Sequence, residues 1–251
     1  MSSSGVSSEM SERPTVLVPI EVLKGESIPD GIPELLSEAH VVLLGYHVIP
    51  EQTAAGQARM QFEDRANQRL DEFEAMFLEA GATVEHRLVF THAKQKTIDR
   101  MIQEHECDAV LVPSAAKEIT DVLVAVRGTV GIDRITRLVG GLFASQGIRV
   151  TLTHVLRKDE DEGDAETVLE GYATRLEKLG VDADLIDWEL KTGSRPIDVL
   201  VEAARSYDAV VMGESDPSLV TYVFGMGEDQ VAEQFLGPVL IVKRGPQARA
   251  E

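Results

Sequence analysis

The chain has one cysteine, Cys107, in 251 residues, which excludes a disulfide within the chain. A single thiol is typical of a protein in a reducing compartment. Its neighbours Glu106 and Asp108 disfavour a thiolate, so we expect an inert thiol. Apolar runs long enough to cross a membrane are also missing, and residues 1–12 lack the basic and apolar segments of a secretory signal. We therefore expect a cytoplasmic, soluble protein whose first 12 residues form a disordered tail.

Basic residues are scarce, since 24 Lys and Arg stand against 43 Asp and Glu, for a formal charge of −19. Only 8 of the cations are Lys. Such a negative field repels phosphate backbones and anionic membrane surfaces, so we expect neither nucleic acid nor the membrane as a partner. An acidic, solvated surface of this kind suits a halophile-like cytosol, in which salt screens the self-repulsion. The charge itself predicts no specific function.

Short runs of Val, Leu and Ile, bounded by turn residues, recur along the chain and predict strands. Most are continuous rather than alternating, as expected of parallel strands covered on both faces. The predicted strands are residues 15–20, 41–49, 83–90, 109–112, 122–126, 150–156, 183–190, 209–212 and 239–242. Residues 60–80 and 166–179 carry apolar side chains at helical spacing and stop at Gly81 and Gly180. Alternating strands and helices predict an α/β fold with a parallel sheet.

The pattern occurs twice in the same order. Residues 97–112 match 196–212, residues 16–20 match 122–126, residues 46–49 match 153–156, and Gly81 matches Gly180. We interpret this as two tandem domains of one kind, each an open parallel sheet, over residues 13–118 and 119–244, with a tail over 245–251. The first copy is shortened. It lacks the loop, the helix near residues 228–236 and the fifth strand of the second copy, so its strand at 109–112 needs a cover.

Several of these segments resemble the universal stress protein family over most of residues 15–244. The features are a first strand ending in Val18–Pro19–Ile20 or Val124–Ala125–Val126, His–Val at 47–48 and 154–155, Gly-x-x-Pro at 193–196, Asp-Ala-Val-Val-Met-Gly at 208–213 and Gly-Pro-Val-Leu-Ile-Val at 237–242. The resemblance implies a flavodoxin-like fold, similar to the adenine nucleotide alpha hydrolases, with strand order 3-2-1-4-5. It also implies dimers through the fifth strand in many members and ATP binding in some.

The family's phosphate loop, Gly-x-x-Gly followed later by Gly-Ser or Gly-Thr, is altered in this sequence. Gly213 fits the first position, but Asp216 replaces the second glycine, and Gly225 falls one residue early and precedes Met226. Arg127 stands where members often have an acidic residue. The functional interpretation is an altered adenine-nucleotide pocket formed by Val126, Arg127, Val155, Gly213, Ser215, Gly225, Met226 and Gly227. The alternative is that the fold is kept, the ligand is lost and the glycines serve turns.

No constellation for catalysis or metal binding stands out among the six histidines. His47 and His154 recur at the ends of equivalent strands, and we expect both to hydrogen-bond backbone. The acidic run at 159–164 predicts a solvated loop.

Two functions remain open. One is a non-catalytic regulatory or interaction module that docks onto itself or a partner protein. The other is an ATP-binding stress sensor that uses the altered pocket of the second copy. The resemblance adds a transporter's cytosolic face as a candidate partner, and hydrolysis ranks last.

Overall fold

A computed structural model describes residues 13–114, 118–126, 131–214 and 237–243 of the chain. Its first half consists of strands and helices in alternation. In order these are β1 (Thr15–Glu21), α1 (Ile32–Leu35), β2 (His40–Val48), α2 (Ala55–Ala80), β3 (Thr83–Thr91), α3 (Lys94–Glu104) and β4 (Ala109–Val112). The long helix α2 ends at Gly81, whose φ of 108° is a left-handed conformation that glycine adopts without strain.

The second half continues the alternation. It comprises β5 (Asp121–Ala125), α4 (Ile132–Phe143), β6 (Arg149–Leu156), α5 (Glu162–Lys178), the 3-10 turn η1 (Ala183–Leu185), β7 (Ile186–Thr192), α6 (Pro196–Ala204), β8 (Ala209–Gly213) and β9 (Val239–Val242). All nine predicted strands are present. The seventh starts three residues late because the Asp182 side chain accepts the backbone N–H of Asp184 and closes η1. The helix predicted near residues 228–236 lies outside the described residues.

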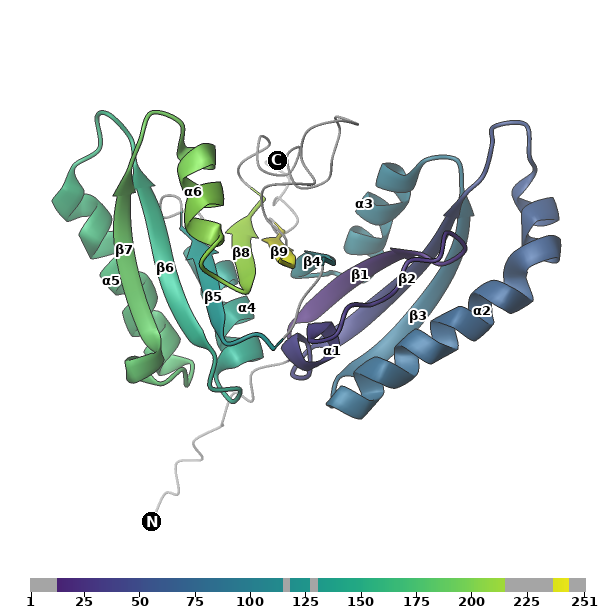
Figure 1. The fold of residues 1–251 in the computed structure, drawn as a ribbon, viewed down its shortest axis with the longest axis horizontal. Coiled ribbons are helices and arrows are strands. Elements are labelled where there is room, and N and C mark those ends of the chain that lie inside the picture. The colour runs from purple at the N-terminus through teal and green to yellow at the C-terminus, as the bar shows by residue number, and fades with distance from the viewer. Residues whose placement is uncertain (1–12, 115–117, 127–130, 215–236, 244–251) are drawn as a thin grey trace, which may run out of the picture.

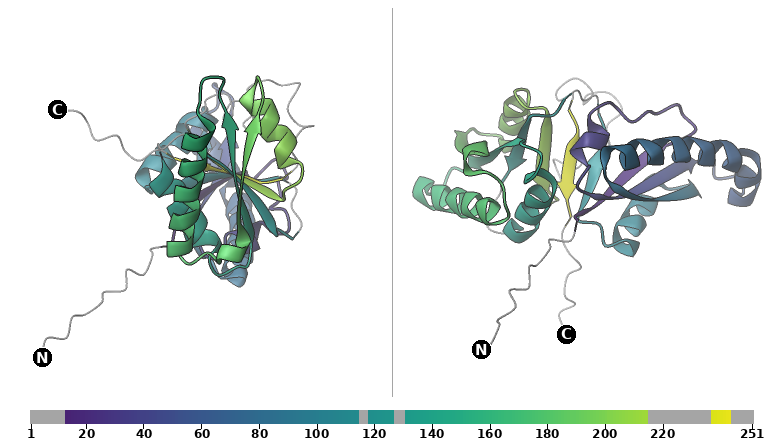
Figure 2. Two further views of the ribbon diagram at one scale, coloured as in Figure 1. Left: turned by 90° about the vertical axis from the view of Figure 1, so that its left-hand side faces the viewer. Right: turned by 90° about the horizontal axis from the view of Figure 1, so that it is seen from below.

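The nine strands form one sheet in the order β3-β2-β1-β4-β9-β8-β5-β6-β7. The prediction of two separate sheets is therefore wrong. Each half nevertheless follows the predicted order 3-2-1-4-5, with β9 as the shared fifth strand. The first half reads β3-β2-β1-β4-β9, and the second half reads β7-β6-β5-β8-β9. The joining strand is β9, which pairs in parallel with β8 and antiparallel with β4. Figure 1 shows β9 between β8 and β4 at the centre of the molecule, and Figure 2 shows it edge-on between the halves.

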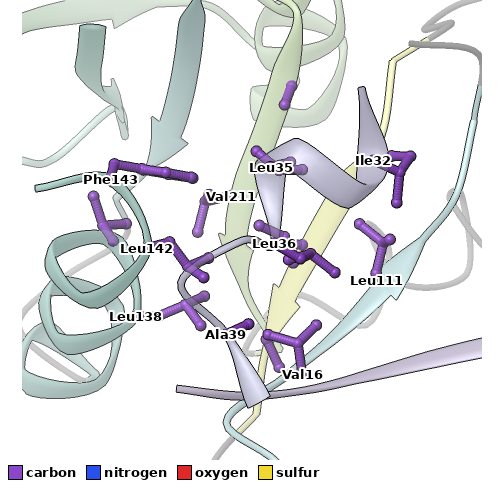
Figure 3. Packing of buried hydrophobic residues seen from close by; sticks show 14 of the residues in the cluster. Val16, Ile32, Leu35, Leu36, Ala39, Leu111, Leu138, Leu142, Phe143 and Val211 are labelled. Carbon is purple, nitrogen blue, oxygen red and sulfur yellow. The ribbon is translucent and has the colours of Figure 1, made fainter. Parts of the chain in front are cut away.

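Helices cover both faces of the sheet. On one face α1, α2, α4 and α5 pack on alternate strand residues in a core that is continuous through both halves. On the other face α3 and α6 cover separate, smaller cores. Figure 3 shows the junction, where Leu36, just after α1, lies toward Leu138 and Leu142 of α4 with Val211 of β8 nearby. The halves thus share one apolar interior instead of being joined by a free linker.

Two aspartates that lie 100 positions apart in the repeat have equivalent structural roles. The carboxylate of Asp108 accepts the backbone N–H of Thr15 at 2.9 Å, just before β1 begins. The carboxylate of Asp208 accepts the N–H groups of Thr120 and Asp121 at 2.9 and 3.0 Å, where β5 begins. Each aspartate therefore fixes the start of the first strand in its own half.

Candidate functional site

The carboxyl ends of β5, β6 and β8 meet in the second half. In an open α/β sheet the crevice outside the strands' carboxyl ends, where the strand order reverses, is the usual ligand site. Here that point lies between β5 and β8, which pair as far as Ala125 and Met212. Val126 follows at the end of β5, and its N–H donates to Thr153 of β6 at 2.9 Å. Gly213 ends β8.

The structure therefore brings Val126 and Gly213 to the same edge of the sheet, with Val155 near the end of β6. The other predicted pocket residues, Arg127, Ser215, Gly225, Met226 and Gly227, lie outside the described residues, so the predicted pocket stays a prediction. Within the described structure a Cβ on Gly213 would meet only Ile135 Cδ1, at an ordinary 3.8 Å. By contrast, a Cβ on Gly193 would lie 2.4 Å from Val199 Cγ2. Packing explains the glycine at 193 but does not explain the one at 213.

His154 lies on β6 close to these carboxyl ends, and its exposed fraction is 4%. Its Nδ1 lies 2.7 Å from the carbonyl oxygen of Val126, and its Nε2 lies 2.9 Å from Glu160 Oε1. The prediction that this histidine bonds backbone is confirmed. Burial opposes ionisation of Glu160, but the Arg157 N–H and His154 outweigh it and hold the pKa of Glu160 below its usual value. Residues 159 and 161–164 of the acidic run are exposed, as predicted, but Glu160 is half-buried with defined partners, and from Glu162 the run forms the first turn of α5 instead of a loop.

The equivalent His47 behaves differently, and the prediction for it is wrong. Its Nδ1 is buried and has no hydrogen-bond partner among the described residues. Its ring lies edge-on to Phe62 and Phe90, with centroids 6.0 and 6.1 Å away. Thr53 stands six residues after His47, at the place that Glu160 takes after His154. The first half therefore has no carboxylate for this histidine.

A cavity of about 300 Å³ opens at the carboxyl ends of β1 and β4, the equivalent point of the first half. Glu26, Tyr46 and Lys94 line it together with apolar residues. The Lys94 ammonium lies 5.1 Å from the centre of the Tyr46 ring. Burial, and then the nearby carboxylates Glu26 and Glu21, raise the pKa of Tyr46 above its usual value. Sequence reasoning missed this cavity because Glu26, Tyr46 and Lys94 belong to no phosphate-binding motif.

A backbone N–H in the wall of this cavity, of the kind that could bind a phosphate, already has a hydrogen-bond partner within the chain. The N–H of Glu21, at the end of β1, donates to Glu26 Oε2 at 2.5 Å. Pro19 and Pro113, which also line the cavity, have no N–H. The described first half therefore presents carboxylate rather than free amides at the end of its first strand.

One group outside these two places has the residue types of a metal site. Asp71 and Glu74 of α2 and His86 of β3 place their donor atoms within 4.8 Å of one another. His86 Nδ1 is already hydrogen-bonded to Glu74 Oε2 at 2.5 Å, and Asp71 is exposed. An ion pair between α2 and β3 accounts for this group, and the absence of a metal stays a prediction.

No helix in the described part of the chain is long and apolar enough to cross a membrane. No family model matches the sequence, and no curated protein matches it. Solved structures do. A universal stress protein from Archaeoglobus fulgidus DSM 4304 is similar at 14% identity and a TM-score of 0.61, covering 92% of this chain and 96% of that one.

Two further structures are similar over different shares of the chain. A putative universal stress protein from Pseudomonas aeruginosa UCBPP-PA14 matches at 16% identity over 93% of this chain and 94% of its own, with a TM-score of 0.46. A universal stress protein from Archaeoglobus fulgidus in complex with dAMP matches at 23% identity over 49% of this chain and 98% of its own, with a TM-score of 0.40.

The strand order and the helices on both faces define an α/β protein with a mostly parallel sheet. The chain has the fold of universal stress proteins, and the resemblance predicted from the sequence is confirmed at the level of the fold.

Proposed function

We propose that this chain is a non-catalytic regulatory or interaction module of the universal stress family, in which the nucleotide pocket of the first half is closed to nucleotides. One observation carries the proposal: the backbone N–H of Glu21, at the end of β1, donates to the Glu26 carboxylate and is therefore not free to bind a phosphate. Phosphate binding in α/β sheets uses free backbone N–H groups at this place. Only residues 113–120 separate β4 from β5, which is too short a segment for a phosphate loop followed by a helix.

Electrostatics acts in the same direction. A phosphate in this cavity would meet the carboxylate of Glu26, and two like charges about 4 Å apart repel by about 4 kcal/mol at an effective dielectric constant of about 20. Lys94 is the cation of the cavity wall, and it already lies over the Tyr46 ring. The overall charge of −19 adds to the repulsion.

A thermal-shift titration with ATP in high-salt buffer tests the proposal. A ligand at a hundred times its dissociation constant stabilises a protein by about 2.7 kcal/mol. We expect no shift of the melting temperature at millimolar ATP. A shift that disappears when the cavity is altered by Lys94→Ala would contradict the proposal.

Glu26→Gln, with exposed Glu34→Gln as the matched control, tests the cause. If the carboxylate excludes nucleotides, only the variant at Glu26 can gain a shift.

The second candidate function is an adenine-nucleotide sensor in the second half, formed by the predicted pocket around Val126, Val155 and Gly213. The specific support is Gly213 at the end of β8, which packing among the described residues does not require, since a Cβ there would make only an ordinary contact. If ATP raises the melting temperature, Gly213→Ala should abolish that rise without lowering the stability of the free protein. The double change Asp216→Gly with Met226→Ser should increase it, because it restores the loop pattern.

Partners and location complete the proposal. We infer that the chain acts in the cytoplasm, which the lone, buried Cys107 supports. We propose a second copy or another protein, such as the cytosolic face of a transporter, as the partner. The described sheet leaves β3 and β7 as its edges, because both sides of β9 are paired. Size-exclusion chromatography with light scattering, on the intact chain, tests self-association.

A further inference from the structure

The hydrogen bonds of His154 determine where its protons lie. A backbone carbonyl oxygen can only accept, so the bond of 2.7 Å to Val126 requires a hydrogen on Nδ1. A neutral imidazole carries one hydrogen and would then present a bare Nε2 to Glu160. Two acceptors cannot form the bond of 2.9 Å, so a second hydrogen must lie between them.

That hydrogen belongs to the imidazole and not to the carboxyl. Glu160 Oε2 accepts the backbone N–H of Arg157 at 3.1 Å, and the Arg157 guanidinium lies 3.6 Å from the same oxygen. Both contacts favour the ionised carboxylate. The lowered pKa of Glu160, held down by the Arg157 N–H and His154 against the effect of burial, agrees with this assignment.

We propose that His154 is a buried proton-binding site, at which the imidazolium joins the carboxyl end of β5 to the connection between β6 and α5. The structure makes this a switch. Loss of one proton leaves the ring with a single N–H, so it can hold Val126 or Glu160 but not both. The change falls at the strand ends of the second half, and it does not depend on whether a nucleotide binds there.

The other charged groups of the surrounding described elements have partners elsewhere or lie on the other face. The buried face of α5 is apolar except for Tyr172, whose hydroxyl is buried with no hydrogen-bond partner among the described residues, and the α5 cap Asp161 accepts the N–H of Asp164. Leu190 of β7 pairs beside His154. The other ion pairs of these elements are Asp133 of α4 with Arg175 of α5, Glu189 with Lys191 on β7, Arg149 with Asp121 and Asp187 at the amino ends of the strands, and Arg195 with Asp198 and Arg205 with Glu202 around α6. Glu160 is therefore the one described carboxylate that His154 contacts.

Nitrogen NMR of the imidazoles in the full chain tests the proposal directly. Near neutral pH we expect both ring nitrogens of His154 to give the resonances of protonated nitrogens. Glu160→Gln should convert His154 to a neutral ring protonated at Nδ1, because the glutamine amide can donate to a bare Nε2. Glu162→Gln, an exposed carboxylate two residues away, should leave both resonances unchanged.

Two outcomes would overturn the proposal. They are a singly protonated His154 in the wild type near neutral pH, or a ring that stays doubly protonated in Glu160→Gln. Since Glu160→Gln keeps the size and the hydrogen-bonding capacity of the side chain, we expect it to fold, and circular dichroism of each variant checks this.

Discussion

Asp108 and Asp208 have the same structural role but accept different numbers of backbone hydrogen bonds, so the effects of replacing them can be compared within one protein. Replacing either by Ala removes a carboxylate that holds the start of a first strand. Asp108 accepts one hydrogen bond, from Thr15 N. Asp208 accepts two backbone hydrogen bonds on one oxygen, from the N–H of Thr120 and the N–H of Asp121 at 2.9 and 3.0 Å. The Thr120 hydroxyl lies 3.1 Å from the same oxygen, and its single hydrogen is shared with the nearer Asp121 carboxylate at 2.8 Å.

A hydrogen bond to a charged group contributes about 1.5–3 kcal/mol when it is buried, and less where water reaches the freed N–H. Since both places are partly exposed, we expect Asp108→Ala to cost about 1 kcal/mol and Asp208→Ala about 2 kcal/mol. For a chain of this size that corresponds to falls of the melting temperature of about 2–4 °C and about 4–8 °C. Urea unfolding followed by circular dichroism and by Trp188 fluorescence measures both.

The pH dependence gives an independent check. Burial opposes ionisation of Asp208, but the N–H groups of Thr120 and Asp121 outweigh it and lower its pKa below the usual 3.8. The unfolded chain then binds more protons than the folded one in this range, so stability rises with pH. The contribution of Asp208 is present above the ordinary value and is lost as pH falls through the lowered one. Equal costs for the two variants, or a cost of Asp208→Ala that persists in acid, would refute the assignment.

Three further predictions follow from the packing. Burial, and then the nearby Asp108 and Glu85, raise the pKa of the Cys107 thiol to about 12, so a thiol reagent at mildly alkaline pH should react only with the unfolded chain, and equal rates in native and denatured protein would contradict this. A Cβ on Gly45 would lie 2.7 Å from both terminal carbons of Leu70, so Gly45→Ala should destabilise by about 1–3 kcal/mol, whereas Gly56→Ala, which meets nothing within 4 Å, should not destabilise the protein by this clash in the same melts. Removing residues 239–243 should expose the edges of β4 and β8, and light scattering should then report aggregation; a stable monomer would show that β9 is dispensable.

The sequence predicted the elements well because local patterns specify them. Continuous Val and Leu runs mark β5 and β8, and the stops at Gly81 and Gly180 mark the ends of α2 and α5. Helix α1 spans four residues and has no periodicity to detect. The sequence did not predict the pairing of β9 with β4, because these strands lie far apart in the chain. It indicated only that some other segment must pair with or shield the exposed edge of β4.

The candidate sites were harder to predict for a physical reason. The bond between His154 and Glu160 depends on the path of the chain between them, and charged side chains in a row give no sign of which one turns inward. The cavity beside Tyr46 arises from the way residues 22–29 fold back toward β1, which leaves no motif. Of the predicted pocket, the strand-end residues Val126, Val155 and Gly213 could be placed because strand ends follow from the topology.

The central position of β9 has a consequence for synthesis on the ribosome. The first half leaves the exit tunnel with the edge of β4 uncovered, and its partner strand β9 is made only after β5 to β8. Contacts between such distant segments form late and slowly. We therefore expect the nascent first half to wait with an open strand edge during translation of the second, and to be the species that chaperones bind.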